Sequence, residues 1–137
     1  MGGKDIWVTT YDKRKKKWDD PKNLGVNVNT GGDEVFPFAH DDGYLYFSSN
    51  GLEGMGGLDI FKSYKLNQTA WSPANNLKGP INSGNDDFGF IIDYSIQKDE
   101  DILQKGYFTS KRSDGIGNDD IYIFEKKQRV ILIYGGT

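Results

Sequence analysis

Acidic side chains recur in adjacent pairs at corresponding points of this chain, which is 137 residues long. The residues that form a possible rim for a ligand or cation are Asp33, Glu34, Asp86, Asp87 and Asp119. Carboxylate oxygens are the ligands that hard cations such as Ca²⁺ prefer. Their spacing does not match the EF-hand loop, and solvated acid on the protein surface is the simpler alternative. We therefore predict no dedicated metal site and no other cofactor, and keep calcium at this rim as a hypothesis.

The residues that usually build catalytic sites are few. His40 is the only histidine and there is no cysteine, so zinc sites and nucleophilic relays based on histidine lack their usual parts. We expect His40 to be a surface residue beside a turn. Two carboxylates can hydrolyse a glycoside, but no pair here stands apart from the repeated acids. The sequence therefore predicts that the protein is not an enzyme.

A basic run occupies residues 13–17, with Asp12, Asp19 and Asp20 beside it. The whole chain carries 17 Lys and Arg against 20 Asp and Glu, so its net charge of −3 favours neither nucleic acid nor an anionic membrane surface. We expect the run to be a solvated hairpin and no nucleic acid to bind. No segment approaches the roughly 20 apolar residues that cross a bilayer, so no membrane span is expected.

The element that positions several acids is a motif of glycines, an aspartate, an isoleucine and an aromatic residue, which occurs three times. Its glycines and aspartates are Gly2, Gly3, Asp5, Gly56, Gly57, Asp59, Gly117 and Asp120. Successive aspartates are 54 (59 − 5) and 61 (120 − 59) positions apart, and such a period indicates a repeat architecture. We predict a structural role, in which each aspartate caps N–H groups between a glycine-rich turn and a strand.

A second repeated segment is a polar turn, residues 28–34, which matches residues 81–87 at an offset of 53 (82 − 29). The offset is 52 at Phe36 and Phe88 (88 − 36) and 61 at Phe47 and Phe108 (108 − 47). Insertions at one place in a repeat usually form a loop. We therefore expect about nine extra residues in the copy that begins at residue 81, within residues 94–105.

Short runs of β-branched and aromatic residues, separated by Gly, Asn and Asp, predict an all-β fold with four strands in each repeat. The repeat length and strand number are those of a β-propeller blade, which is a four-stranded antiparallel sheet. We expect about ten strands, or about two and a half blades, in units of residues 1–27, 28–80 and 81–134. Propellers typically close with roughly four to eight blades, so we expect an incomplete propeller over residues 1–125. Residues 126–137 are an outer strand or the start of a following domain.

The segment from Asp41 to Gly51, followed by residues 54–61, resembles the WD40-like, TolB-type β-propeller repeat. Its form with Ser-Ser-Asn-Gly before the glycine–aspartate motif is similar to repeats of OmpA-family envelope proteins of the Bacteroidetes. The resemblance covers residues 1 to about 125. It implies a non-catalytic scaffold, or protein-interaction module, with protein partners in the cell envelope.

The same resemblance implies a location in the periplasm or at the outer membrane, and a link to secretion or outer-membrane assembly. Two other functions remain as alternatives. In one alternative, the blades are part of the propeller of a glycosidase or peptidase. In the other, they form a module that binds calcium or carbohydrate.

Open blades leave strand edges and apolar faces without partners. We therefore expect the chain to associate with itself or with the remaining blades of a longer protein. Met1 aligns with Met55 inside a repeat, so we expect the chain to start partway through a structural unit, with any targeting signal upstream.

Overall fold

The computed structural model describes residues 2–94, 102–113, 117, 119–127 and 130–135. These residues form twelve β-strands and their connecting turns, and none of them is helical. The strands are β1 (Trp7–Val8), β2 (Tyr11–Asp12), β3 (Lys17–Trp18), β4 (Lys22–Asn23), β5 (Glu34–Ala39), β6 (Tyr44–Ser49), β7 (Asp59–Tyr64), β8 (Asn75–Asn76), β9 (Asp87–Ile92), β10 (Gln104–Ser110), β11 (Asp120–Lys126) and β12 (Ile131–Gly135). The all-β fold class is confirmed. The strand number exceeds the expected ten because the two strands expected in the first repeat are each divided into two short ones.

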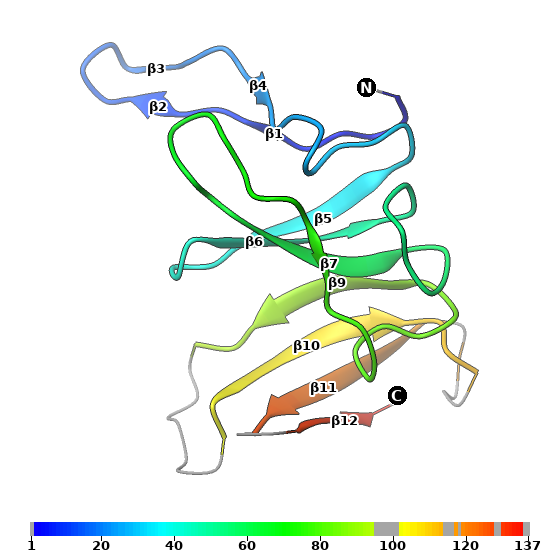
Figure 1. Cartoon of the computed structure of the whole chain (residues 1–137). Helices are drawn as coiled ribbons and strands as arrows, with labels where there is room; N and C mark the ends of the chain where they lie inside the picture. The colour runs from blue at the N-terminus through cyan, green and yellow to red at the C-terminus, as the bar shows by residue number, and fades with distance from the viewer. Residues whose placement is uncertain (1, 95–101, 114–116, 118, 128–129, 136–137) are drawn as a thin grey trace.

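Two four-stranded antiparallel sheets form the body of the molecule. One has the order β5-β6-β7-β8 and the other β9-β10-β11-β12, so strands that are neighbours in the chain are neighbours in the sheet. In the first repeat, β1 pairs with β4 and β2 pairs with β3 as two-stranded ribbons. Figure 1 shows the β1–β4 ribbon and the two sheets stacked one upon another. The four-stranded antiparallel unit is thus confirmed, while no sheet among the described residues closes on itself.

The register of the two sheets corrects the alignment of the repeats. In β5 and β9 alike, a bulge follows the first two paired residues. Phe36 and Gly89 lie at these bulges with φ angles of 53° and 67°, so they are equivalent and the offset stays at 53 (89 − 36). The offset of 52 is wrong because it matches one phenylalanine with another.

The size of the insertion changes with this correction. The hairpin between β5 and β6 has 5 residues between the paired Ala39 and Leu45 (45 − 39 − 1). The hairpin between β9 and β10 has 13 between the paired Ile92 and Gly106 (106 − 92 − 1), so eight residues are inserted and not nine. Residues 95–101 of this hairpin lie outside the described residues.

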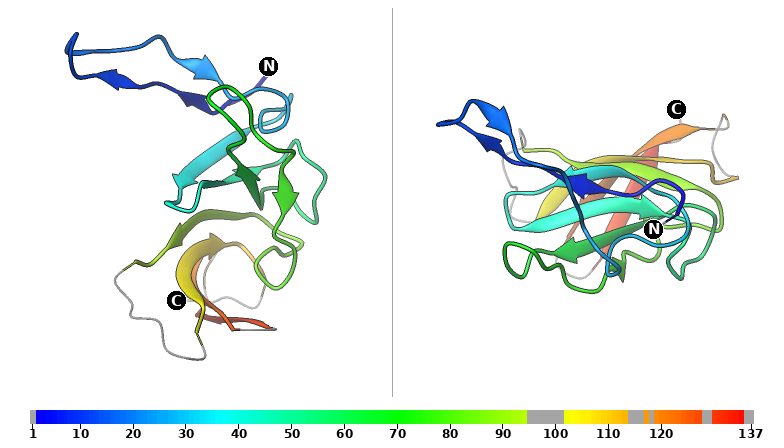
Figure 2. Two further views of the ribbon diagram at one scale, coloured as in Figure 1. Left: turned by 60° about the vertical axis from the view of Figure 1, so that its left-hand side comes forward. Right: turned by 90° about the horizontal axis from the view of Figure 1, so that it is seen from above.

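The core lies in two layers, one between the β1–β4 ribbon and the first sheet and one between the two sheets, whose arrangement Figure 2 shows from two further sides. Successive residues of a strand point to opposite faces of its sheet. Leu45 and Phe47 of β6 therefore pack toward the β1–β4 ribbon, whereas Tyr46 packs toward the second sheet. The first layer contains Ile6, Leu24, Val28, Leu45, Phe47 and Phe61. The second contains Tyr46, Ile60, Ile81, Phe90, Ile92, Phe108, Tyr122 and Phe124.

None of the described residues belongs to a helix that is long and apolar enough to cross a membrane.

Candidate functional site

The repeated aspartates hold the turns that precede the third strand of each sheet. Asp59 Oδ2 accepts hydrogen bonds from the backbone N–H groups of Met55 (2.5 Å) and Gly56 (3.0 Å). Asp120 accepts the N–H of Gly117 in the same way, at 3.1 and 3.0 Å. In the first repeat, Asp5 Oδ2 accepts a bond of 3.1 Å from the Asn23 side chain. The predicted capping role is confirmed for Asp59 and Asp120.

Close packing against backbone accounts for the glycine at position 56 of the motif, and a carboxylate side chain crowds position 57. A Cβ atom on Gly56 would lie 2.6 Å from the backbone oxygen of Asn85, and one on Gly57 would lie 2.3 Å from Asp86 Oδ1. Both neighbours belong to the turn that leads into the next sheet. The glycines therefore allow the turn of one repeat to approach the turn of the following one.

Burial affects the chemistry of Asp59, whose side chain is buried in the turn. Burial raises the pKa of the Asp59 carboxyl above its ordinary value, the hydrogen bonds from Gly56 and Met55 lower it, and the charges of Asp87 and Asp86 raise it further. The net direction is upward. Its Oδ1 atom is buried and accepts no hydrogen bond from the part of the chain that the structure describes.

Two members of the proposed acidic rim are buried supports of the turns. Glu34 accepts hydrogen bonds from Thr30 N (2.8 Å), Thr30 Oγ1 (2.6 Å) and Ser49 Oγ (2.6 Å). Asp87, at the equivalent position, accepts bonds from Ser83 N (2.7 Å) and Ser110 Oγ (2.6 Å). Both carboxylates are thus engaged by the fold.

Asp87 has a further partner that its equivalent Glu34 does not have among the described residues. The Arg112 guanidinium donates to Asp87 Oδ1 at 3.1 Å and to the backbone oxygens of Pro80 and Ile81. The guanidinium carbon also lies 4.9 Å from the centre of the Tyr122 ring. Arg112 therefore ties the turn before β9 to the strands β10 and β11.

The other members of the rim link one sheet to the next. Asp33 Oδ1 accepts the N–H of Lys4, and Asp86 Oδ1 accepts the N–H of Leu58, both at 2.8 Å. Asp119 is exposed and lies 3.8 Å from Lys111 Nζ, which is also 3.9 Å from Asp86. The structure thus brings Asp86 and Asp119 together around one lysine, while Asp33 and Glu34 belong to the preceding sheet.

Among the described residues, no group of three or more His, Asp or Glu side chains could hold a metal ion. The calcium hypothesis for the rim therefore stays a prediction that the geometry does not favour.

Two asparagines, Asn29 and Asn82, join successive repeats through their side chains. The sequence predicts them only as turn residues. The Asn82 side chain accepts the N–H of Ile60 at 2.7 Å and donates to its C=O at 2.8 Å. Asn29 makes the same pair of bonds with Ile6, at 2.8 and 2.9 Å. Both amides are buried. Each one clamps the third strand of one repeat to the turn of the next, and the signal for it was the repeated Asn at an offset of 53 (82 − 29).

A backbone pair closes the same boundaries beside the asparagine clamp. The N–H of Glu34 donates to the C=O of Lys4, and the N–H of Asp87 donates to the C=O of Leu58, both at 2.7 Å. Each boundary between successive sheets therefore has one amide clamp, one carboxylate link and one backbone bond at equivalent positions.

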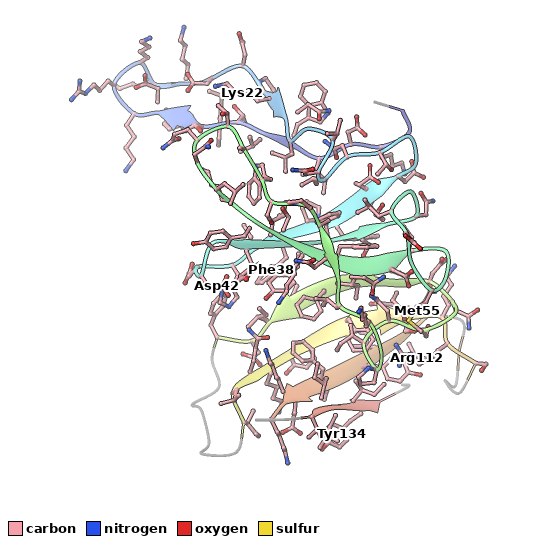
Figure 3. All side chains as sticks on the ribbon, viewed as in Figure 1. Lys22, Phe38, Asp42, Met55, Arg112 and Tyr134 are labelled. Carbon is pink, nitrogen blue, oxygen red and sulfur yellow. The ribbon has the colours of Figure 1, made fainter. Side chains whose placement is uncertain are left out.

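The outward face of the second sheet has equivalent residues, but no other sheet among the described residues covers it. Ile121 is equivalent to Ile60 at the offset of 61, yet it is 56% exposed where Ile60 is 0% exposed. Directly paired residues share a face of a sheet, and Ile91, Tyr107, Ile123 and Tyr134 are paired in a row across the four strands. We call these five residues the outer face. Figure 3 shows Tyr134 at the end of the stack opposite to Lys22.

A cavity of about 310 Å³ lies between the β5–β6 turn and the β9–β10 hairpin. Its lining residues are His40, Asp41, Ile92, Asp93, Tyr94, Ile102, Leu103, Gln104 and Lys105. The rings of His40 and Tyr94 are 5.2 Å apart, and His40 Nδ1 lies 2.9 Å from Asp42 Oδ1. The His40 side chain is 15% exposed at this cavity, so the histidine lies beside the turn as expected but is partly buried.

Comparisons of the chain with protein-family models, with curated proteins and with solved structures gave no match.

Proposed function

We propose that each four-stranded sheet is one blade of a β-propeller, and that the chain acts as a non-catalytic scaffold that binds protein through its outer face. The observation that carries the proposal is the contrast between Ile60, which is 0% exposed, and its equivalent Ile121, which is 56% exposed. The same position is covered by the next sheet in one repeat and uncovered in the other. A contiguous apolar face of this kind is typical of protein interaction sites.

The covered boundary indicates the kind of partner that fits. Between the two sheets, the first sheet contributes Tyr46 and Ile60, and the second covers them with Phe90 and Phe108. The outer face offers Tyr107 and Ile121 at the positions of Tyr46 and Ile60. A partner with a twisted sheet and an asparagine-bearing turn would bury these residues in the same way.

The roles of the carboxylates also support a scaffold over a hydrolase. Glu34 and Asp87 are buried and hold the turns, and Asp33 and Asp86 hold the N–H groups of the preceding repeat. A glycosidase needs two carboxyl groups that face the substrate. These four carboxylates instead face the backbone that they stabilise.

The cellular setting that we propose is the envelope of a bacterium, in the periplasm or at the outer membrane. The resemblance of residues 41–51 and 54–61 to envelope-protein repeats supports this location. Protein partners there, including those of secretion or outer-membrane assembly, are part of the same proposal.

The substitution Ile121→Lys tests the outer face. We expect the wild-type chain to self-associate in a concentration-dependent manner, because exposed sheet faces and edges pair with one another. The variant should raise the dissociation constant by about tenfold or more, because a charge is placed in the centre of the contact. Static light scattering over a dilution series measures this.

Leu66→Lys is the matched control, because Leu66 is similarly exposed, at 60%, but lies in a hairpin away from the outer face. This variant should associate as the wild type does. A wild-type chain that is monomeric throughout the dilution series would contradict the proposal, as would equal effects of the two substitutions.

A further inference from the structure

The hairpin formed by β2 and β3 projects from the stack, away from both four-stranded sheets (Figures 1 and 2). Tyr11 pairs with Trp18 and Asp12 with Lys17 at its base. Its tip carries five consecutive basic residues, all exposed: Lys13, Arg14, Lys15, Lys16 and Lys17. We call residues 11–18 the basic hairpin.

The backbone of the tip is organised, so the cations are presented by a defined turn. Asp12 Oδ1 accepts the N–H groups of Arg14 at 2.9 Å and Lys15 at 3.1 Å. Lys16 has a φ of 53°, in the left-handed region where glycine or asparagine would be less strained. A lysine at this position is not what the turn itself favours, and strained residues of this kind are often tied to function.

The unit of residues 28–80 contains an equivalent hairpin, with which the basic hairpin can be compared. Six residues separate Tyr64 from Trp71, as six separate Tyr11 from Trp18, but only Lys65 among those six is basic. Trp71 packs against the first core layer, whereas Trp18 is 64% exposed. The repeat therefore needs the length and the aromatic residues, while the basic tip belongs to the first copy alone; Trp18 is exposed because no preceding sheet among the described residues covers it.

The exposed rings suit an interface between water and lipid. The rings of Tyr11 and Trp18 lie 5.3 Å apart on the hairpin. Tryptophan and tyrosine are enriched where amphipathic rings reach the headgroup level of a membrane. Clusters of Lys and Arg beside them are attracted to anionic headgroups.

Local charge outweighs the net charge of −3 in this geometry. Charges separated by more than about 8–10 Å are largely screened at physiological salt. A surface touched by the tip therefore meets mainly the five cations, and Asp12, Asp19 and Asp20 offset them only in part. The projecting hairpin also suits the flat surface of a bilayer better than a single nucleic acid strand, which is usually bound in a groove of the protein.

We propose that the basic hairpin docks the protein onto a bilayer that contains anionic lipid, with the cations at the headgroups and Trp18 at the interface. This goes beyond the scaffold function, because it uses the opposite end of the molecule from the outer face.

Vesicle co-sedimentation tests the proposal with the full chain. The chain should bind vesicles of phosphatidylcholine and phosphatidylglycerol, should not bind vesicles of phosphatidylcholine alone, and should dissociate as NaCl is raised. The triple variant Lys13→Gln, Arg14→Gln, Lys15→Gln should weaken binding by about tenfold or more. The matched control is Lys65→Gln, Lys105→Gln, Lys126→Gln, which removes the same charge elsewhere and should bind as the wild type does.

A second readout places the tryptophan. In the variant Trp7→Phe, Trp71→Phe, the remaining Trp18 should show a blue-shifted emission when anionic vesicles are added, and brominated lipid should quench it. This readout also gives an answer if a tip variant folds poorly, because it leaves the tip intact.

Three results would overturn the proposal. These are the absence of binding to anionic vesicles at low salt, equal loss of binding in both triple variants, and an unshifted Trp18 emission upon binding. A chain that binds a single-stranded oligonucleotide in preference to anionic vesicles would assign the hairpin to nucleic acid instead. The outer-face test is independent of all of these, since Ile121 is not part of the hairpin.

Discussion

The hydrogen bonds and the burial of Asp59 shift its pKa in opposite directions. Its carboxylate must accept two backbone N–H groups, which favours the charged form, but it is buried near Asp86 and Asp87, which favours the neutral form. Burial is the largest influence and raises the pKa. The turn before β7 is therefore sensitive to pH at one residue.

The pH dependence of stability follows from this raised pKa. The folded protein binds the Asp59 proton more tightly than the unfolded chain, whose pKa is near the ordinary 3.8. The stabilisation is thus complete below that value and is lost as pH rises through the folded pKa. The free energy of unfolding of the wild type, relative to Asp59→Asn, should therefore increase as pH falls from about 7 to about 4. Urea denaturation of both proteins across this range measures it, and a difference that does not change with pH would refute the assignment.

The asparagine clamp gives the second prediction at this scale. Asn82→Ala leaves the buried N–H of Ile60 without its partner and removes one of the two hydrogen bonds to the Ile60 C=O, which keeps its bond from Leu77, so it should lower the free energy of unfolding by about 1–3 kcal/mol. Asn85→Ala in the same turn is the control, since Asn85 is exposed, and it should change stability by less than about 0.5 kcal/mol. Chemical denaturation compares the two, and similar losses would argue against the clamp.

The sequence correctly predicts the role of a side chain whose hydrogen-bond partners are close in the chain. The capping by Asp59 follows from the glycine turn a few residues before it, because such bonds are local. The clamp by Asn82 reaches Ile60 in another sheet, and only the stacking of the sheets brings them together. The burial of Glu34 and Asp87 was not predicted for a different reason, because paired acids usually indicate a solvated surface.

At the scale of the element, the bulge in the first strand of each sheet is the feature that the sequence conceals. Phe36 and Gly89 share this position and its positive φ, although one is the bulkiest kind of residue and the other the smallest. Phe36 stacks on Phe88 of the next sheet, with ring centres 5.1 Å apart. Its packing offsets the strain of its backbone, so the residue type did not reveal the bulge.

Gly89→Ala tests the strain of the bulge alone. An added Cβ would meet nothing closer than Thr109 Oγ1 at 3.7 Å, so there is room for it. The positive φ of 67° should still lower the free energy of unfolding by about 1–2 kcal/mol. Thermal or urea unfolding measures this loss. Gly84→Ala is the control, because Gly84 has neither a positive φ nor an atom within 4 Å of the added Cβ, and it should be neutral or slightly stabilising. Equal losses in the two variants would show that the bulge carries no strain.

For the whole molecule, the repeat period together with the runs of β-branched and aromatic residues was sufficient to predict an all-β fold of four-stranded antiparallel sheets. The stacking of the sheets was predictable only in outline, and so was the outer face at one end of the stack. Ile60 and Ile121 occupy the same place in the repeat, and they differ because, among the described residues, a following sheet covers Ile60 and none covers Ile121. Exposure at this scale depends on the neighbour of a repeat and not on its own residues.

The asparagine clamp has a consequence for the order in which the molecule forms during synthesis. Asn82 lies 22 residues after Ile60, and Asn29 lies 23 residues after Ile6. A ribosome releases the chain from its N-terminus, so each third strand emerges before the amide that locks it. The β1–β4 ribbon and the first four-stranded sheet are therefore each locked only after the following turn has been synthesised. Contacts of such short sequence separation keep the search for partners local and favour rapid folding for an all-β chain.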